Sequence, residues 1–144
     1  MSKRIIINVC APPNSGKTTG IGRVFDEYVQ SSLPKMTKEQ NLVYRRLNRD
    51  FQTERFGIRI INGKRVGFYS KGDNLDALPV IHLFLFFFKC DIVIAASHPN
   101  SKMQQYLKEL AEFCGDYAEI LHEGELRQGE KIHRQIRNKL KSFL

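Results

Sequence analysis

The residues best suited to chemistry form one short segment, 11–19, with the sequence Ala-Pro-Pro-Asn-Ser-Gly-Lys-Thr-Thr. Its spacing matches the phosphate-loop pattern G-x-x-x-x-G-K-[ST], with alanine in place of the first glycine. In such a loop, backbone N–H groups and the start of the next helix converge on a β-phosphate, where the helix dipole favours negative charge. Gly16 lets the backbone approach closely, Lys17 brings a cation to the β- and γ-phosphates, and Thr18 offers a hydroxyl to Mg²⁺. The predicted nucleotide-binding residues are Pro13, Asn14, Ser15, Gly16, Lys17, Thr18 and Thr19, and Lys17 is also predicted to be catalytic.

A metal bound to such phosphates usually also has a carboxylate near it. In a parallel sheet, ligand groups gather at the C-terminal ends of the strands. Asp73 follows the run 66–70 and falls at that edge, and Asp76 is a second candidate, whereas Asp91 begins its run and falls at the opposite edge. We therefore predict that Thr18 and Asp73 hold Mg²⁺ and that Asp73 is catalytic. The alternative for Asp73 is an ordinary turn residue.

A second polar segment follows the apolar run 91–96. Ser97, His98 and Lys102 leave the ligand side of that strand, where they could contact a base, a second substrate or the γ-phosphate. The alternative is a strand-to-helix turn with a serine cap and a solvated lysine. His98 has no paired His or Cys at ligand spacing, so a metal role for it is not indicated.

Arginines are concentrated in the stretch 35–56, which reads as a helical or partly mobile insert. Thr37 and Gln40 have capping-box spacing. Arg45 and Arg49 would belong to a lid that clamps transferred phosphate, or to a surface that binds nucleic acid. A simply solvated helix face is the third interpretation.

The remaining pattern predicts the elements that hold these residues. Runs of β-branched and apolar residues predict strands, and Asn62-Gly63 between two of them predicts a hairpin. Apolar stripes with a period near 3.6 predict helices, and Asp76 is expected to cap one that has Pro79 in its first turn and carries Leu83 to Phe88 into the core. Strands are expected at 5–10, 58–61, 64–69, 91–96 and 117–121, and helices from 17, 76, 101 and about 131. Strands separated by helices predict a three-layer α/β sandwich with a mainly parallel sheet and one antiparallel hairpin strand.

Length and composition fit one domain over residues 1–144. The chain is 42% hydrophobic and 26% charged, and 23 Lys and Arg against 15 Asp and Glu give a net charge of +8, which favours anionic partners. Three scattered cysteines support neither a disulfide framework nor a zinc site. The apolar stretch 77–88 is too short for a bilayer. We expect a cytoplasmic protein without a membrane segment, and the sequence does not indicate its oligomeric state.

With its phosphate loop between a strand and a helix, the chain resembles the P-loop NTPase superfamily, specifically over residues 5–30. Residues 64–76 and 90–102 also resemble small, poorly characterised P-loop proteins. The resemblance implies a single-domain protein that binds Mg²⁺ and ATP and hydrolyses the nucleotide or transfers a phosphoryl group to an acceptor.

Two other functions stay open. Ser70-Lys71-Gly72-Asp73 is similar to a degenerate Asn-Lys-x-Asp guanine motif and would fit a GTP-binding switch, although its order along the chain differs from that of GTPases. A basic nucleic-acid-binding or adaptor protein could instead use the loop for anion contact without turnover.

Overall fold

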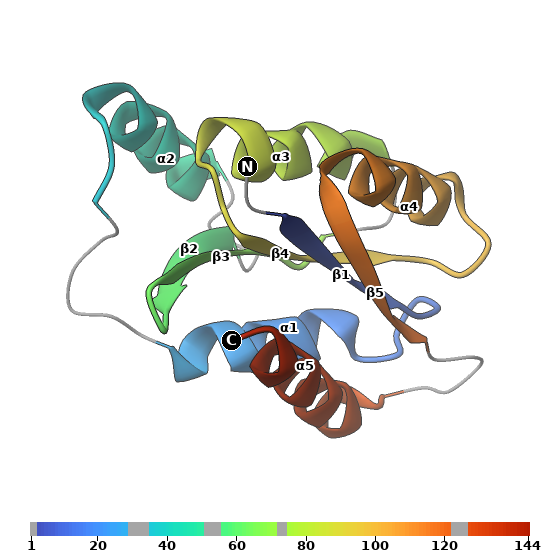
Figure 1. Ribbon diagram of the computed structural model, residues 1–144. Coiled ribbons are helices and arrows are strands. Elements are labelled where there is room, and N and C mark those ends of the chain that lie inside the picture. The colour runs from blue at the N-terminus through green and yellow to red at the C-terminus, as the bar shows by residue number, and fades with distance from the viewer. Residues whose placement is uncertain (1–2, 29–34, 51–55, 72–74, 122–126) are drawn as a thin grey trace.

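The computed structural model describes residues 3–28, 35–50, 56–71, 75–121 and 127–144 as an α/β fold with helices on both faces of one sheet (Figure 1). The strands are β1 (Arg4–Cys10), β2 (Phe56–Ile61), β3 (Lys64–Tyr69), β4 (Ile92–Ser97) and β5 (Gly115–Leu121). The helices are α1 (Lys17–Glu27), α2 (Lys38–Asp50), α3 (Leu78–His82), α4 (Lys102–Cys114) and α5 (Gly129–Phe143). In this part of the chain the layered α/β prediction is confirmed.

The sheet is mixed, with strand order β2-β3-β4-β1-β5. β1 lies between β4 and β5 and is parallel to both, and β3 is parallel to β4. β2 pairs with β3 in the antiparallel sense. The turn between them has positive φ at Asn62 (50°) and Gly63 (78°), as a type I′ hairpin turn requires, so the hairpin prediction is confirmed.

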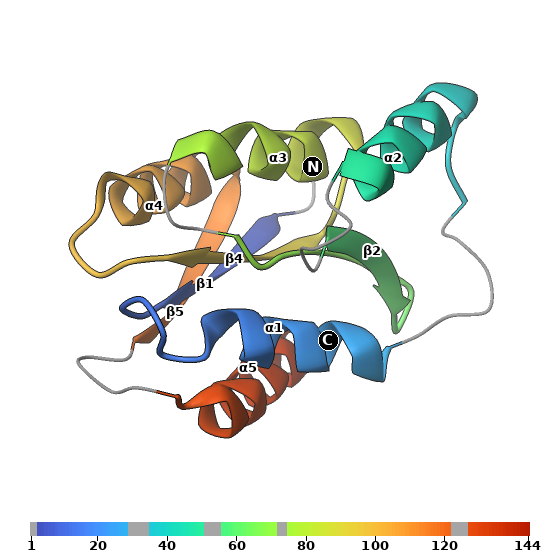
Figure 2. The same ribbon diagram turned by 180° about the vertical axis from the view of Figure 1, so that it is seen from behind.

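Helices α1 and α5 cover one face of the sheet, and α2, α3 and α4 cover the other (Figures 1 and 2). Alternate residues of β1 therefore enter two separate cores: Ile6 packs on the α3 and α4 side, and Ile7 and Val9 pack on the α1 and α5 side. Residues 6–10 are fully buried. A strand covered on both faces needs a mostly apolar sequence, and the run after Arg4 was recognisable because Asn8 is the one amide among its aliphatic residues and Cys10.

The segment before β4 differs from the single capped helix that was expected. It begins as a 3₁₀ turn, η1 (Leu75–Ala77), continues as α3, and ends as a π-helical turn, η2 (Leu83–Phe87), in which Phe88 N donates to Leu83 O over 2.8 Å. Ala77 occupies the N-cap position of α3, and Asp76 lies inside the preceding 3₁₀ turn, so Asp76 is not the N-cap residue that was expected. The wider turn leaves Phe84 and Phe88 buried but Phe86 46% exposed, and Phe86 is therefore not core.

Helix α2 occupies residues 38–50 of the expected insert and is packed against the domain. Thr37 and Gln40 form the predicted capping box, since each side chain accepts a hydrogen bond from the other's backbone N–H over 3.0 Å. Tyr44 is buried, and its hydroxyl accepts a hydrogen bond from the Ile58 N–H over 3.0 Å. These contacts make α2 part of the helical layer.

Candidate phosphate-binding site

The loop 11–16 leaves the C-terminal end of β1 and leads directly into α1, at the edge of the sheet where β4 also ends. Ala11 N donates to Ser97 O over 3.0 Å, which ties the loop to β4, and Ser15 N donates to Pro12 O over 3.3 Å. Left-handed backbone occurs at Asn14 (φ 62°) and Gly16 (φ 105°). The loop thus curls ahead of a helix N-terminus, the arrangement that suits anion binding.

Ala11 fits the position where the pattern has glycine. Its φ is not positive and it is fully buried, so a methyl group is accommodated there. The left-handed conformation that demands glycine falls at Gly16 instead, where a Cβ would also lie 2.4 Å from the Gly129 nitrogen. The departure from the pattern at Ala11 therefore does not alter the loop's curl.

Lys17 folds back over the loop. Its side chain is buried, with 7% of the residue exposed, and Nζ donates to Ala11 O over 2.8 Å and lies 3.5 Å from Ser97 O. The ammonium group is thereby held where β1 and β4 end. A cation fixed beside an α-helix N-terminus adds to the positive potential that the helix dipole produces.

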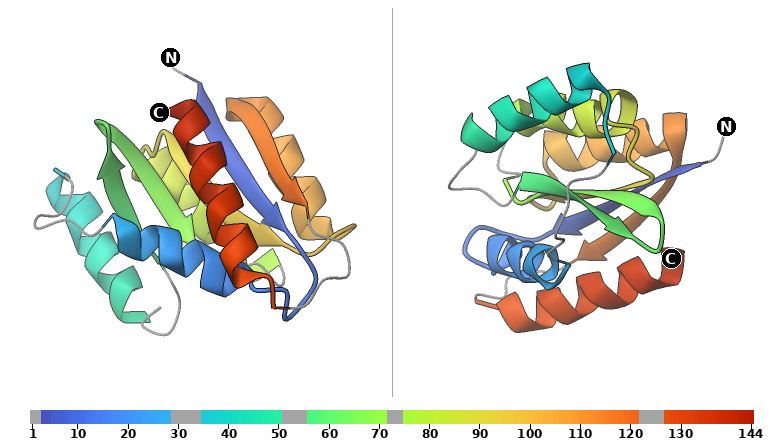
Figure 3. Two further views of the ribbon diagram at one scale, coloured as in Figure 1. Left: turned by 90° about the horizontal axis from the view of Figure 1, so that it is seen from below. Right: turned by 90° about the vertical axis from the view of Figure 1, so that its left-hand side faces the viewer.

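A contact that the sequence did not indicate joins this loop to the start of α5. Arg127 N donates to Asn14 O over 2.9 Å, and Gln128 N donates to Ser15 O over 2.5 Å. The backbone of Gly129 follows directly and packs on Gly16 and on the Thr19 side chain. The two helices therefore begin side by side, and Figure 3 shows them running along the same face of the sheet.

A cleft of about 1050 Å³ lies between the two helix starts. Most predicted loop residues line it: Pro13, Asn14, Gly16, Lys17, Thr18 and Thr19. Ser15 is fully buried and does not. The sequence did not predict the rest of the lining, because Lys131 and Arg134 look like outward-facing charges of an amphipathic helix. These further lining residues are Arg127, Gln128, Gly129, Glu130, Lys131 and Arg134, together with Arg23 from α1.

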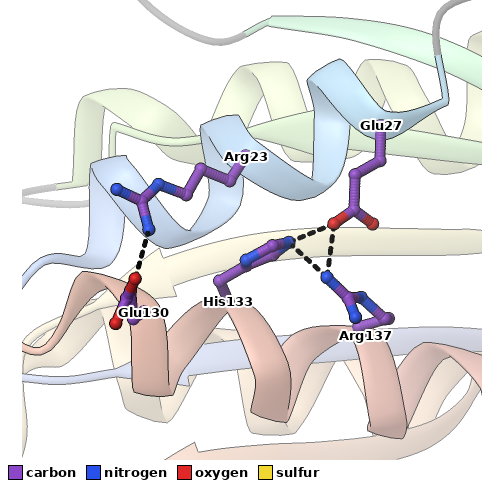
Figure 4. Close-up of polar contacts among 5 residues, drawn as sticks. All are labelled: Arg23, Glu27, Glu130, His133 and Arg137. Atoms are coloured by element: carbon purple, nitrogen blue, oxygen red, sulfur yellow. Dashed lines mark hydrogen bonds and ion pairs between the residues drawn. The ribbon is translucent and has the colours of Figure 1, made fainter.

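Polar contacts link α1 to α5 along this cleft and beyond it (Figure 4). Arg23 Nη1 lies 3.9 Å from Glu130 Oε1. One turn further along α1, Glu27 Oε1 accepts a hydrogen bond from Arg137 Nη2 over 2.6 Å and also contacts His133 Nε2. Partial burial favours a raised pKa for Glu27, but the hydrogen bonds from Arg137 and His133 outweigh it, and the pKa is lowered.

The segment after β4 is built mainly as a turn. Ser97 is fully buried, and its hydroxyl exchanges hydrogen bonds with the Asn8 side chain over 2.8 and 3.0 Å. Ser101 caps α4 by accepting from Gln104 N over 3.1 Å, and its hydroxyl donates to His98 O over 2.6 Å. Ser97, His98 and Lys102 do not line the cleft. The turn-and-cap interpretation accounts for the geometry described here, and Ser97 contributes to the loop through its carbonyl.

Asn8 is the centre of a buried polar network behind the loop. Its Nδ2 also donates to the Tyr117 hydroxyl over 2.9 Å, and that hydroxyl donates to Glu119 Oε1 over 2.7 Å. Gln104 Nε2 donates to the same carboxylate oxygen over 2.7 Å. Burial raises the pKa of Tyr117, which keeps the phenol protonated as a donor. The network joins β1, β4, β5 and α4.

The expected carboxylate partner, Asp73, lies outside the described residues. Asp76 is exposed in η1, and Asp91 accepts a hydrogen bond from Arg65 N over 2.9 Å at the opposite edge of the sheet, where it was expected. Within the described ranges, no three His, Cys, Asp or Glu residues cluster as a metal site. Thr18 is exposed at the cleft and remains the described candidate for a metal ligand.

Arg45 and Arg49 are exposed on α2, which covers the other face of the sheet from α1 (Figure 2). Neither lines the cleft. The structure therefore does not bring them together with the loop residues, in contrast to Arg23, Arg127 and Arg134.

Comparisons of the chain with protein-family models, with curated proteins and with solved structures find no match. Among the described residues, no helix has the length and apolar character needed to cross a membrane.

Proposed function

We propose that the protein is a small P-loop NTPase that binds Mg²⁺ and ATP at the loop 11–19 and either hydrolyses the nucleotide or transfers its γ-phosphoryl group to an acceptor. One observation carries the proposal: the buried Lys17 ammonium is held at the curled loop where α1 begins, beside an open cleft. Backbone N–H groups, a helix dipole and a fixed cation together favour a polyphosphate.

Each loop residue would have a distinct task. Gly16 lets the backbone approach the β-phosphate, and Lys17 balances charge on the β- and γ-phosphates. Thr18 and Asp73 would be the residues that hold Mg²⁺, which when bound would supply positive charge beside the phosphates. Positioning and charge neutralisation would supply the catalysis, because phosphoryl transfer requires little covalent chemistry from the protein.

The cleft favours one alternative, a protein that uses the same loop for contact with nucleic acid without turnover, because its wall is rich in arginine. Phosphate release distinguishes this alternative from an NTPase. A competition series with ATP, GTP and CTP decides the base preference and tests the GTP-binding switch at the same time.

We also propose a reducing, cytoplasmic location, because the three cysteines are free thiols. Burial raises the pKa of Cys90 to about 12, so that thiol is unreactive at neutral pH.

The proposal is tested by titrating wild type, Lys17→Ala and Lys108→Ala with a fluorescent ATP analogue and Mg²⁺. Lys108 is an exposed lysine on α4, in the other helical layer, and serves as the matched control. We expect Lys17→Ala to weaken binding at least about tenfold, the loss of one charge-assisted contact, while the melting curve stays near wild type. Thr18→Ala should reduce the dependence of binding on Mg²⁺. Equal affinity of Lys17→Ala and wild type would contradict the proposal.

A further inference from the structure

The cleft extends beyond the loop as a groove between α1 and α5. Arg23 lies one turn, about 5.4 Å, beyond Thr19 on α1, and Arg134 lies one turn beyond Glu130 on α5. Arg127 stands at the start of the same groove, where its backbone N–H is bonded to Asn14 O. Arg23 and Arg134 therefore lie one turn further along the cleft than Thr19 and Glu130, and Arg127 lies where the loop meets the start of α5.

The cleft carries more positive charge than is needed to neutralise a Mg²⁺-bound triphosphate. Of the described lining residues, five are cationic (Lys17, Arg23, Arg127, Lys131 and Arg134) and one, Glu130, is acidic. Mg²⁺ already cancels part of the charge of a triphosphate, whereas one more phosphomonoester adds about −1.5 to −2. In the described part of the chain, the side chains of Arg127 and Arg134 form no ion pair.

The chemistry of the lining is also unusual for a site that takes an uncharged nucleoside. Ligand pockets are mostly lined by apolar and aromatic side chains. Here the described lining includes no aromatic residue, and Pro13 is its one apolar side chain. Arginine recognises phosphate through a planar fork of donors, so this wall suits a phosphate better than a bare sugar or base.

We infer that the arginine groove formed by Arg23, Arg127 and Arg134 binds a second phosphate, esterified to the ribose of the nucleotide whose 5′-phosphates occupy the loop. This inference rests on the proposed function. It names the substrate class as a nucleotide phosphorylated at a ribose hydroxyl, whether that phosphate ends a mononucleotide or links the next residue of an oligonucleotide. Glu130, which neutralises Arg23 across 3.9 Å, would then weaken binding of this class.

The test compares three probes by calorimetry in Mg²⁺ at constant ionic strength: ATP, ATP that carries a 3′-phosphate, and a 5′-triphosphorylated trinucleotide. We expect the 3′-phosphate to tighten binding about tenfold, as one arginine–phosphate contact would. Trinucleotide affinity equal to that of 3′-phosphorylated ATP, or higher, identifies an oligonucleotide ligand, and affinity no higher than that of ATP identifies a mononucleotide. If neither the 3′-phosphate nor the trinucleotide binds more tightly than ATP, the inference is overturned.

Variants test whether the gain in affinity from the 3′-phosphate depends on the arginine groove. Arg134→Gln and Arg23→Gln should each remove most of this gain, measured in each variant as the ratio of its affinities for 3′-phosphorylated ATP and for ATP. Glu130→Gln should increase it. Arg46→Gln is the control, because it removes the same charge from the exposed face of α2, where Arg46 pairs with Asp50 at 3.6 Å. It should leave the gain from the 3′-phosphate unchanged. A gain that survives in both arginine variants overturns the inference.

The two proposals fail in different ways. If wild type binds ATP and Lys17→Ala does not, yet the 3′-phosphate adds nothing, the loop assignment stands and the groove assignment falls. If 3′-phosphorylated ATP binds wild type and Lys17→Ala equally, the groove binds phosphate and the proposed function of the loop is wrong.

Discussion

Gly16 and Gly129 approach so closely that a Cβ on Gly16 would lie 2.4 Å from the backbone nitrogen of Gly129. One residue ends the loop before α1, and the other begins α5. This approach requires glycine at position 16, whereas a Cβ on Gly129 would instead meet the Thr19 side chain, at 2.9 Å from its Cγ2. The spacing of these two helices is therefore set at the candidate site itself.

Gly129→Ala tests this dependence. The new Cβ would lie 2.9 Å from Thr19 Cγ2, and we expect the free energy of unfolding to fall by about 1–3 kcal/mol and Mg²⁺-ATP binding to weaken. Gly63→Ala is the control. Its Cβ would meet nothing within 4 Å, and its positive φ should cost about 1 kcal/mol without affecting binding. Urea denaturation and nucleotide titration measure the two effects, and unchanged binding in Gly129→Ala would refute the dependence.

Asn8→Ala should be among the most destabilising polar substitutions in this chain. It removes the donor to Ser97 and Tyr117 from a fully buried position, and we expect a loss of about 2–4 kcal/mol in urea denaturation. Tyr117→Phe keeps the ring and removes one hydroxyl, so its loss should be smaller, about 1 kcal/mol. A loss below that of Tyr117→Phe would show that the network contributes little.

The lowered pKa of Glu27 predicts a dependence of stability on pH. A carboxyl group whose pKa is depressed in the folded state stabilises the fold above its ordinary pKa of 4.5, and this contribution is lost as the pH falls through the lower folded value. Glu27→Gln should therefore melt at a lower temperature than wild type at neutral pH. The difference between the two melting temperatures should become smaller below about pH 4.5. Glu112→Gln, an exposed carboxylate on α4, is the control. A melting-temperature difference that does not change with pH would contradict this role of the Glu27 carboxylate.

The arginines of α2 give a prediction about turnover. Because neither Arg45 nor Arg49 lines the cleft, we expect the double variant Arg45→Ala/Arg49→Ala to keep its affinity for ATP within about twofold. If α2 acts as a lid on the transferred phosphate, the rate of phosphate release should nevertheless fall. Equal rates for the double variant and wild type would remove the lid hypothesis.

Short-range sequence patterns were sufficient to predict most of the strands and helices. The β-branched run of β1, the Asn-Gly turn and the capping box at Thr37 each specify their element through neighbouring residues. The segment 75–88 was misjudged because a continuous apolar run does not distinguish α, 3₁₀ and π hydrogen bonding, all three of which occur here.

Only the part of the candidate site that lies within one short sequence segment was predictable. The pattern at 11–19 identified the loop and Lys17, but nothing near Arg127 or Arg134 in the sequence indicates that they face it, because that contact depends on tertiary packing of α5 on α1. The one local hint was Gly129, because glycine has a low propensity for the helical position that it occupies at the start of α5. Asp73 stays a prediction.

The hydrogen bonds from Arg127 and Gln128 to the loop join segments more than a hundred residues apart. Closing so long a span costs chain entropy, as do the pairings of β1 with β4 and β5. During biosynthesis the chain would thus carry the Gly-Lys-Thr motif before α5 is made, and the cleft wall that α5 supplies would be added only once that helix had docked. Nascent chains that lack α5 should therefore contain the whole motif but lack one wall of the cleft.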